Sequence, residues 1–407
     1  MQLNFILNKF GVSMTINSAN SANSANSANS ANSANSANSA NSANSANSAN
    51  SANSANSANS VRDLCDEFNF GSSPRYIFGR TPYAADIIKK CKPHAVVDDF
   101  TNESHFNGIP VIKLNEIDVN GIVVSAIVDG RPVTATRTLK NKGIRYLDYF
   151  SFKKYAPYKL KEPPHVSSSA FSADYYINKK KYDAIYQLLA DETSKETFSR
   201  LVKFRLTEDL TPMEYFTFRP ADIYFESFVN FRVEGTVFVD VGCFDGSNVI
   251  DFIRLCPDYR SVHLFEPEPK QMEQIKKSLG DFRNITYHQY GASNRAGALR
   301  FTSSGIWSHM DDAGETEVKI NTIDALVNEK ITFMKMDIEG HECSALEGAR
   351  QHIINDHPSL AICAYHLVDD FWKIPELVLS FRPDYHVYMR HYTEGVLETV
   401  FYFVPVH

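Results

Sequence analysis

The sequence predicts an α/β protein with two Rossmann-like sheets, a small one followed by a larger one. Two observations predict the larger sheet: an apolar strand runs into a glycine turn at 238–248, and a second strand ends in Glu266, 20 residues beyond Gly246. The third observation is a series of apolar runs near the end of the chain, at 331–340, 359–366, 385–392 and 398–405. Two β-rich segments therefore close the larger sheet.

Composition and charge exclude several classes of function. The chain has 407 residues, 43% of them hydrophobic, which is enough for two or three domains. Its formal net charge of -7 comes from well-mixed acidic and basic residues without a basic stripe, so we expect no nucleic-acid partner. No apolar run approaches the roughly 20 residues needed to span a bilayer, and residues 1–14 lack the features of a signal peptide. We expect a cytoplasmic protein without stable membrane insertion.

The six cysteines show neither a CxxC pair nor metal-ligand spacing. This scatter is typical of free thiols in a reducing cytosol. We expect no disulfide and no zinc site. The residues concerned are Cys65, Cys91, Cys243, Cys256, Cys343 and Cys363.

A low-complexity repeat separates a short N-terminal segment, 1–16, from the rest of the chain. Residues 17–60 consist of fourteen Asn-Ser-Ala triplets followed by Asn59 and Ser60. Without large apolar side chains such a segment cannot offset the entropy of ordering its backbone, so we expect a disordered spacer. The regular triplets also suggest a repeated nine-base unit in the gene and hence a variable length.

Residues 61–152 are expected to form a small α/β domain. An apolar strand ends at Gly79 and a helix follows, and three more strands lie within 94–100, 108–114 and 121–128. This segment resembles the Rossmann-like N-terminal domains in front of some bacterial sugar-modifying enzymes. The residues that carry the resemblance are Gly79, Asp98, Asp99, Gly108, Ile109, Pro110 and Val111.

The role of this domain stays open at the sequence level. It has no GxGxxG, so a dinucleotide site has little support. A nucleotide-sugar pocket, a surface for homo-oligomerisation and a vestigial domain remain as alternatives. The next segment, 153–232, has apolar residues at three- and four-residue spacing over 179–206 and is expected to be a helical cap.

The stretch FVDVGCFDGSN, 238–248, has the features of a cofactor turn. Asp240 ends the strand, and Gly242 and Gly246 let the chain turn tightly and bring backbone N–H groups toward a ligand. Glu266, at the end of the second strand, is placed to accept hydrogen bonds from two ribose hydroxyls. A NAD enzyme would share this pairing, but Asp240 would repel a pyrophosphate and suits the ammonium of a methionine moiety.

Four segments together resemble the FkbM-type methyltransferases: FVDVGCFDGSN, LFEPEP, ITFMKMDIEGHECSALEGA and AICAYHLVDDFWKIPEL, in this order within 238–405. The resemblance implies a class I (Rossmann-like) methyltransferase sheet with an antiparallel last strand over 233–407. It also implies S-adenosylmethionine as cofactor. The implied contacts to the cofactor are Asp240, Gly242, Asp245 and Gly246 at the methionine part, Glu266 at the ribose and Ser293 near the adenine. The resemblance further implies that Asp337 and Glu339 line the reaction side.

Two positions depart from the family pattern. Phe244 replaces the central glycine of the general D-x-G-x-G-x-G turn, although the family often lacks that glycine. His341 stands where the family usually has a small residue, which changes the expected pocket shape and leaves the substrate open.

Methyl transfer to a hydroxyl needs positioning and a base, because the sulfonium already makes the methyl group electrophilic. His366 is the expected general base, with Asp337 and Glu339 next in line. His309, Trp307 and His341 are candidates for substrate contact. No spaced His/Asp cluster demands a metal, so none is expected.

These residues favour an O-methyltransferase for a sugar hydroxyl of a surface glycan or its nucleotide-linked precursor. Two alternatives remain: methylation of a small natural-product or lipid-linked hydroxyl, and a non-catalytic binding module with a methyltransferase fold.

Overall fold

The computed structural model describes residues 60–163, 168–231, 234–302, 309–310 and 316–406. The chain forms two compact units, Met1–Ser73 and Pro74–His407. In the described part of the first unit, residues 60–70 are helical, so Ser60, the last residue of the repeat, belongs to a helix. The remainder of the repeat lies outside the described residues. No helix in the described ranges is long and apolar enough to cross a membrane.

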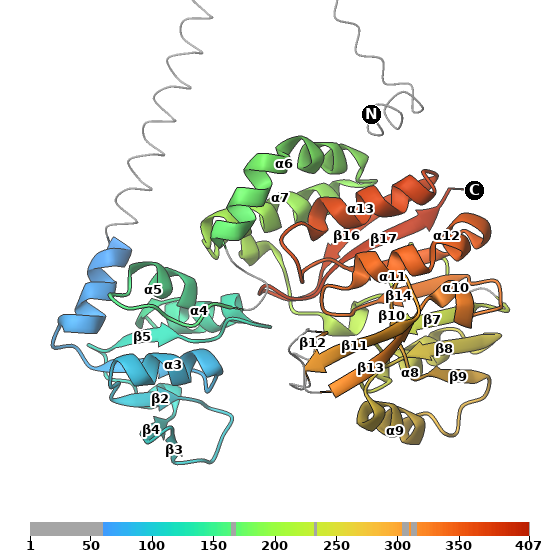
Figure 1. Cartoon of the computed structure of the whole chain (residues 1–407). Helices are drawn as coiled ribbons and strands as arrows, with labels where there is room; N and C mark the ends of the chain where they lie inside the picture. Colours follow the sequence, from blue (N-terminus) through green and yellow to red (C-terminus); the bar gives the residue numbers. More distant parts are fainter. Residues whose placement is uncertain (1–59, 164–167, 232–233, 303–308, 311–315, 407) are drawn as a thin grey trace, which may run out of the picture. The chain divides into compact units, whose positions relative to one another are not determined.

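The second unit begins with a six-stranded sheet of order β3-β4-β2-β1-β5-β6 (Figure 1). All its strand pairs are parallel except β3·β4. The four strands expected from the sequence are present as β1, β2, β4 and β5. The strands are β1 (Arg75–Phe78), β2 (Ala95–Val97), β3 (His105–Phe106), β4 (Ile109–Ile112), β5 (Ile122–Ser125) and β6 (Arg145–Leu147).

Helices α3 (Pro82–Lys90), α4 (Pro132–Asn141) and α5 (Tyr149–Tyr155), with the 3₁₀ helix η1 (Leu114–Glu116), connect and cover this sheet. Gly79 allows the turn after β1 because its φ of +96° is a left-handed conformation. Thr81 then caps α3 by accepting a hydrogen bond from the backbone N–H of Ala84, and Pro82 opens the helix.

Two long helices lie within 153–232, the segment expected to be a helical cap or linker. They are α6 (Ser168–Leu188) and α7 (Glu192–Thr207), and Glu208 ends α7 with a φ of +54°. Between Glu208 and Phe231 the structure has only the 3₁₀ helices η2 (Thr211–Tyr215) and η3 (Pro220–Asp222). Each has a proline in its first turn, and a proline at that place blocks an α-helix that would run into it from the preceding residues.

The larger sheet has seven strands in the order β16-β17-β15-β14-β7-β8-β9. β17 runs antiparallel to β15 and β16, and the other pairs are parallel. This confirms the expected class I sheet with an antiparallel last strand. The strands are β7 (Val237–Val241), β8 (Ser261–Phe265), β9 (Ile285–His288), β14 (Phe333–Met336), β15 (Ser359–Cys363), β16 (Tyr385–His391) and β17 (Thr399–Pro405).

Figure 1 shows α11, α12 and α13 on one side of this sheet and α8 and α9 on the other. The helices are α8 (Ser247–Leu255), α9 (Pro269–Ser278), α10 (Ile323–Leu326), α11 (Glu342–Gly348), α12 (Arg350–Asp356) and α13 (Asp370–Phe381). The sequence did not predict a further small sheet of order β10-β13-β11-β12. Its strands are β10 (Gly291–Ala292), β11 (Gly297–Thr302), β12 (His309–Met310) and β13 (Thr316–Asn321).

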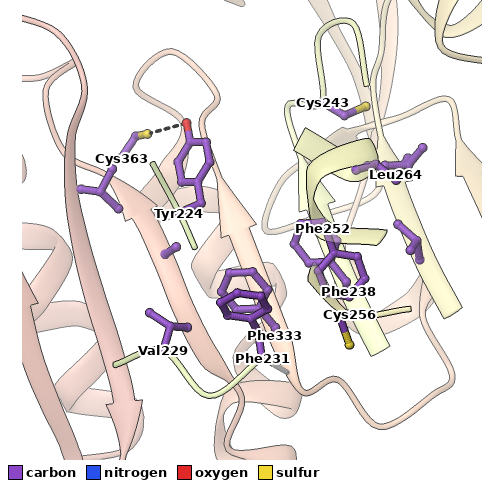
Figure 2. Close-up of a cluster of buried hydrophobic side chains, with 14 of the residues drawn as sticks. Tyr224, Val229, Phe231, Phe238, Cys243, Phe252, Cys256, Leu264, Phe333 and Cys363 are labelled. Atoms are coloured by element: carbon purple, nitrogen blue, oxygen red, sulfur yellow. Dashed lines mark hydrogen bonds between the residues drawn. The ribbon is translucent and has the colours of Figure 1, made fainter. Parts of the chain in front are cut away.

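An aromatic core fixes the segment before β7 to the sheet. Phe238 of β7 stacks on Phe333 of β14 with ring centroids 5.1 Å apart, and Phe231 packs against Phe333 at 5.6 Å. Figure 2 shows Tyr224 pointing toward Cys363, with a hydrogen bond between its hydroxyl and the thiol. The 208–231 segment is therefore anchored along the sheet, with Phe231 at the amino end of β14 and Tyr224 at the carboxyl end of β15.

Candidate active site

A cavity of about 480 Å³ opens at the carboxyl ends of β7, β8 and β14. This is where open α/β sheets bind ligands, and the volume lies within the usual range for ligand pockets. The lining comes from the ends of these strands and the turns after them, from the segment before β7, from β10, from the residues after β15 and from the turn before β17. It comprises Pro220, Ile223, Tyr224, Val241, Gly242, Phe244, Asp245, Ser247, Asn248, Phe265, Glu266, Pro267, Glu268, Gln271, Tyr290, Gly291, Ala292, Lys335, Asp337, Ile338, Glu339, Tyr365, Leu397 and Glu398.

The turn after β7 lies so close to the backbone at the end of β14 that it requires glycine. Gly242 has a φ of +80°, and a Cβ added there would lie 1.9 Å from the carbonyl oxygen of Asp337. Gly246, also at +80°, is the N-cap of α8. Phe244 takes a φ of +46° in the same turn and lines the cavity. The backbone of this turn therefore forms one wall of the cavity.

Asp240 was expected to contact the cofactor, but it lies behind the residues that line the cavity. Its side chain is fully buried and does not line the cavity, whereas Lys335 of β14 does. The Lys335 Nζ lies 3.0 Å from Asp240 Oδ1 and donates to the carbonyl oxygen of Gly242 at 2.7 Å. Burial alone would lower the pKa of Lys335, but the charges of Asp240 and Asp337 outweigh it and raise that pKa. An ammonium group therefore already neutralises Asp240.

Sequence reasoning missed Lys335. The signal was present, because a lysine within the apolar run of a central parallel strand has no solvent to face and must find a partner.

The residues expected around the ribose and adenine follow β8 and β10. Glu266 lines the cavity, and its Oε1 accepts a hydrogen bond from the backbone N–H of Glu268 at 2.9 Å. Burial raises the pKa of Glu266 to about 7. Asp245 also lines the cavity, where its Oδ1 accepts from the backbone N–H of Ser247. Ser293 is buried just beyond Ala292, which lines the cavity while Ser293 does not.

Asp337, directly after β14, is surrounded by donors. Tyr224 donates its hydroxyl to Oδ2 at 2.9 Å, and Tyr365 donates to Oδ1 at 3.2 Å. The His366 Nε2 lies 3.3 Å from Oδ1. Burial would raise the pKa of Asp337, but the hydrogen bond and charge of His366, with the charge of Lys335, hold it well below its usual range. These surroundings thus favour the ionised form of Asp337.

His366 does not have the placement expected of a general base. Its side chain has no exposed surface and does not line the cavity. The Nδ1 lies 2.9 Å from Glu342 Oε1, and Nε2 lies 3.6 Å from Glu339 Oε2. Burial lowers the pKa of His366, but the charges and hydrogen bonds of Glu342 and Asp337 raise it well above the usual value. In this arrangement the His366 ring contacts the carboxylates of Asp337, Glu339 and Glu342 rather than the cavity.

One atom from each of Asp337, Glu342 and His366 lies within 4.8 Å of the others, a spacing that a metal ion also uses. The contacts of His366 with the two carboxylates account for this spacing as ion pairs. We therefore assign no metal to this cluster.

Two glutamates of the cavity lining have left-handed backbones. Glu339 has a φ of +55° and Glu398 a φ of +67°, and both line the cavity. Glu339 was expected from the sequence, whereas Glu398 was missed. It precedes β17, and only its register with respect to β15 brings it to this edge of the sheet.

Comparison with known proteins agrees with this geometry. Residues 240–394 match the family model described as the methyltransferase FkbM domain. The chain carries an FkbM methyltransferase domain. It is therefore a methyltransferase, as the sequence predicted.

The likeness to one solved structure extends beyond the FkbM domain. Methyltransferase FkbM from Methylobacillus flagellatus KT is 24% identical, with a TM-score of 0.66 over 84% of this chain and 92% of that one. An rRNA methylase from Streptococcus thermophilus is 13% identical, with a TM-score of 0.31 over 44% of this chain and 92% of that one. A search of the curated proteins gives no match. The first of these likenesses shows a shared fold.

The three residues expected to contact the substrate lie in different parts of the chain's structure. His341 is the N-cap residue of α11 and is not part of the cavity lining. His309 lies in β12, paired with Thr302 of β11, but its side chain is outside the described part. Trp307 lies outside the described residues altogether.

Proposed function

We propose that this chain transfers a methyl group from S-adenosylmethionine to a hydroxyl of a sugar, in a surface glycan or its nucleotide-linked precursor. The observation that carries the proposal is the polar reaction side of the cavity. Asp337, Glu339 and Glu398 provide acceptors there, and Tyr224 and Tyr365 provide hydroxyls. A polyol offers several donors and acceptors at once, and such a wall pairs with them.

The residues present fit the cofactor. The turn at Gly242 packs against the carbonyl oxygen of Asp337 and forms one wall of the cavity, and Glu266 is a buried carboxylate of the lining, where we expect the ribose. Lys335 presents an ammonium at the cavity wall, where it suits the carboxylate of the methionine moiety. The bound cofactor supplies an electrophilic methyl group on its sulfonium.

The side chains of the chain supply orientation. Asp337 accepts a hydrogen bond from a substrate hydroxyl or attracts the sulfonium charge, and Tyr224 and Tyr365 hold its carboxylate in one orientation. His366 stabilises the ionised form of Asp337 from behind and is a positioning residue. This replaces its expected role as the base.

A second candidate is a small natural-product or lipid-linked hydroxyl. It is favoured by the apolar part of the same wall, formed by Pro220, Ile223 and Leu397. A non-catalytic module is less well supported, because the glycine turn, Glu266 and Asp337 are all retained. We further propose a cytoplasmic location, and a nucleotide-sugar or self-association role for the N-terminal sheet.

Incubation with labelled S-adenosylmethionine and candidate acceptors tests the proposal. We expect label in a glycan or nucleotide-sugar and cofactor binding by calorimetry. Label only in apolar acceptors would favour the second candidate, and cofactor binding without transfer to any acceptor would favour the binding module. Mass spectrometry of surface glycan from cells with and without the gene then identifies the acceptor by the loss of one methyl group.

A further inference from the structure

Glu398 is a carboxylate of the cavity wall without an internal partner. Within the described residues no hydrogen bond or ion pair engages its side chain, and its only recorded bond is the backbone contact from the N–H of Tyr392 at 3.0 Å. The other carboxylates of the reaction side differ: Asp337 accepts from two tyrosines, and Glu339 lies 3.6 Å from His366. Glu398 is therefore available for a hydroxyl of the substrate.

The surroundings of Glu398 suit proton transfer near neutral pH. Burial raises its pKa to about 7, and the negative charges of Asp337 and Glu339 act in the same direction. The positive charges of His366 and Lys335 act against them. A base is most effective when its pKa lies near the working pH. The same surroundings lower the pKa of Asp337, which makes it a weaker base, and raise the pKa of His366, which favours its protonated form.

The backbone of Glu398 is held in an unfavourable conformation by the turn that precedes it. A non-glycine residue at a φ of +67° persists only where the surroundings fix it. Thr393 Oγ1 donates to the carbonyl oxygen of Leu397 at 2.8 Å and closes the turn. At its tip, both oxygens of Glu394 accept bonds of 2.6 Å from Thr134, one from its backbone N–H and one from its hydroxyl.

Gly395, the next residue in this turn, packs closely against the backbone that follows β5. A Cβ added to it would lie 2.6 Å from the carbonyl oxygen of Val128. The contact with Thr134 is made at the first turn of α4, where backbone N–H groups favour an anion. The turn that contains Glu398 is thus held on one side by the loop after β5 and the first turn of α4.

We propose that Glu398 is the general base of the methyl transfer. The proposal rests on the proposed O-methylation. The hydroxyl oxygen bonds to the methyl carbon while the carbon–sulfur bond breaks and its electron pair stays on sulfur. The hydroxyl proton passes to a Glu398 carboxylate oxygen. The products are a methyl ether, S-adenosylhomocysteine and a protonated Glu398, which releases its proton to solvent.

A first test needs no acceptor. Infrared difference spectra of the full chain with bound S-adenosylhomocysteine are recorded between pH 5 and 9, for the wild type and for Glu398→Gln. Glu266 should give a protonated-carboxyl band near pH 7 in both proteins, so we expect the wild type minus Glu398→Gln double difference to contain one further band that titrates near pH 7. A double difference without such a band would overturn the assignment whether or not an acceptor is known.

The second test uses an acceptor that the wild type methylates. Glu398→Gln should lower kcat by about 10²- to 10⁴-fold, keep the Kd of the cofactor within about threefold, and lose the acidic limb of the pH–rate profile. Glu339→Gln, the other left-handed glutamate, should keep that limb. Loss of the limb in Glu339→Gln alone would transfer the role to Glu339. Methylation of apolar acceptors only would refute the sugar proposal while leaving this comparison intact.

Discussion

Lys335 Nζ lies 3.0 Å from Asp240 Oδ1, and both side chains are buried beneath the glycine turn of the cofactor site. Removing one partner of such a pair leaves a charge without compensation. Lys335→Met should therefore lower the free energy of unfolding by about 3–5 kcal/mol, as measured in urea. The double variant Lys335→Met/Asp240→Leu should regain most of this loss. A stable single variant would show that the pair does not contribute as inferred.

Gly242→Ala and Gly235→Ala form a matched pair, because both glycines have similar φ values of +80° and +77°. At Gly235 an added Cβ meets nothing within 4 Å, so only the backbone conformation is penalised, by roughly 1–2 kcal/mol. At Gly242 the Cβ collides with the Asp337 carbonyl oxygen, which should cost roughly 1–3 kcal/mol more. Gly242→Ala should also abolish cofactor binding, as measured by calorimetry. Equal effects of both substitutions would contradict the close approach.

Glu266→Ala removes the carboxylate at the ribose position. It should weaken cofactor binding by roughly 1.5–3 kcal/mol, the usual contribution of hydrogen bonds to a charged group, and leave the unfolding midpoint nearly unchanged. Calorimetry with S-adenosylhomocysteine measures the effect. Glu273→Gln on the exposed face of α9 serves as control. Unchanged affinity in Glu266→Ala would place the ribose elsewhere.

His366 should make stability depend on pH. Its pKa in the folded protein is raised above the ordinary 6.5, so its contribution is fully present below pH 6.5 and declines as the pH rises toward the folded value. Relative to His366→Gln, the wild type should lose about 1.4 kcal/mol per pH unit in that interval. Denaturant unfolding from pH 6 to 9 measures this difference, with His386→Gln on the surface as control. A constant difference between wild type and His366→Gln would mean that His366 is not charged.

Local patterns predicted the parts of the site that lie within one strand and its turn. The glycine turn at 238–248 and Glu266 could be placed because both follow apolar strands at a spacing set by one βαβ unit. Asp337 could be placed for the same reason, since its strand ends beside β7.

Properties that depend on contacts between distant segments could not be predicted. Asp240 was expected to contact the ammonium of the cofactor, and its ion pair with Lys335, 95 residues away in the chain, was not foreseen. The expected role of His366 rested on its place at a strand end and on the ordinary pKa of an imidazole, whereas Glu342 and Asp337 raise that pKa in the fold. Glu398 lies beside the cavity only because β17 inserts antiparallel next to β15.

The contact between Glu394 and Thr134 has a thermodynamic consequence for the N-terminal sheet. Any ligand that shifts the first turn of α4 also changes the free energy of the turn that ends at Glu398. Linkage is reciprocal for binding, so occupation of the cavity must alter the affinity for that ligand by the same factor. Affinity for a nucleotide-sugar, measured with and without S-adenosylhomocysteine, would therefore report energetic communication between the two sheets.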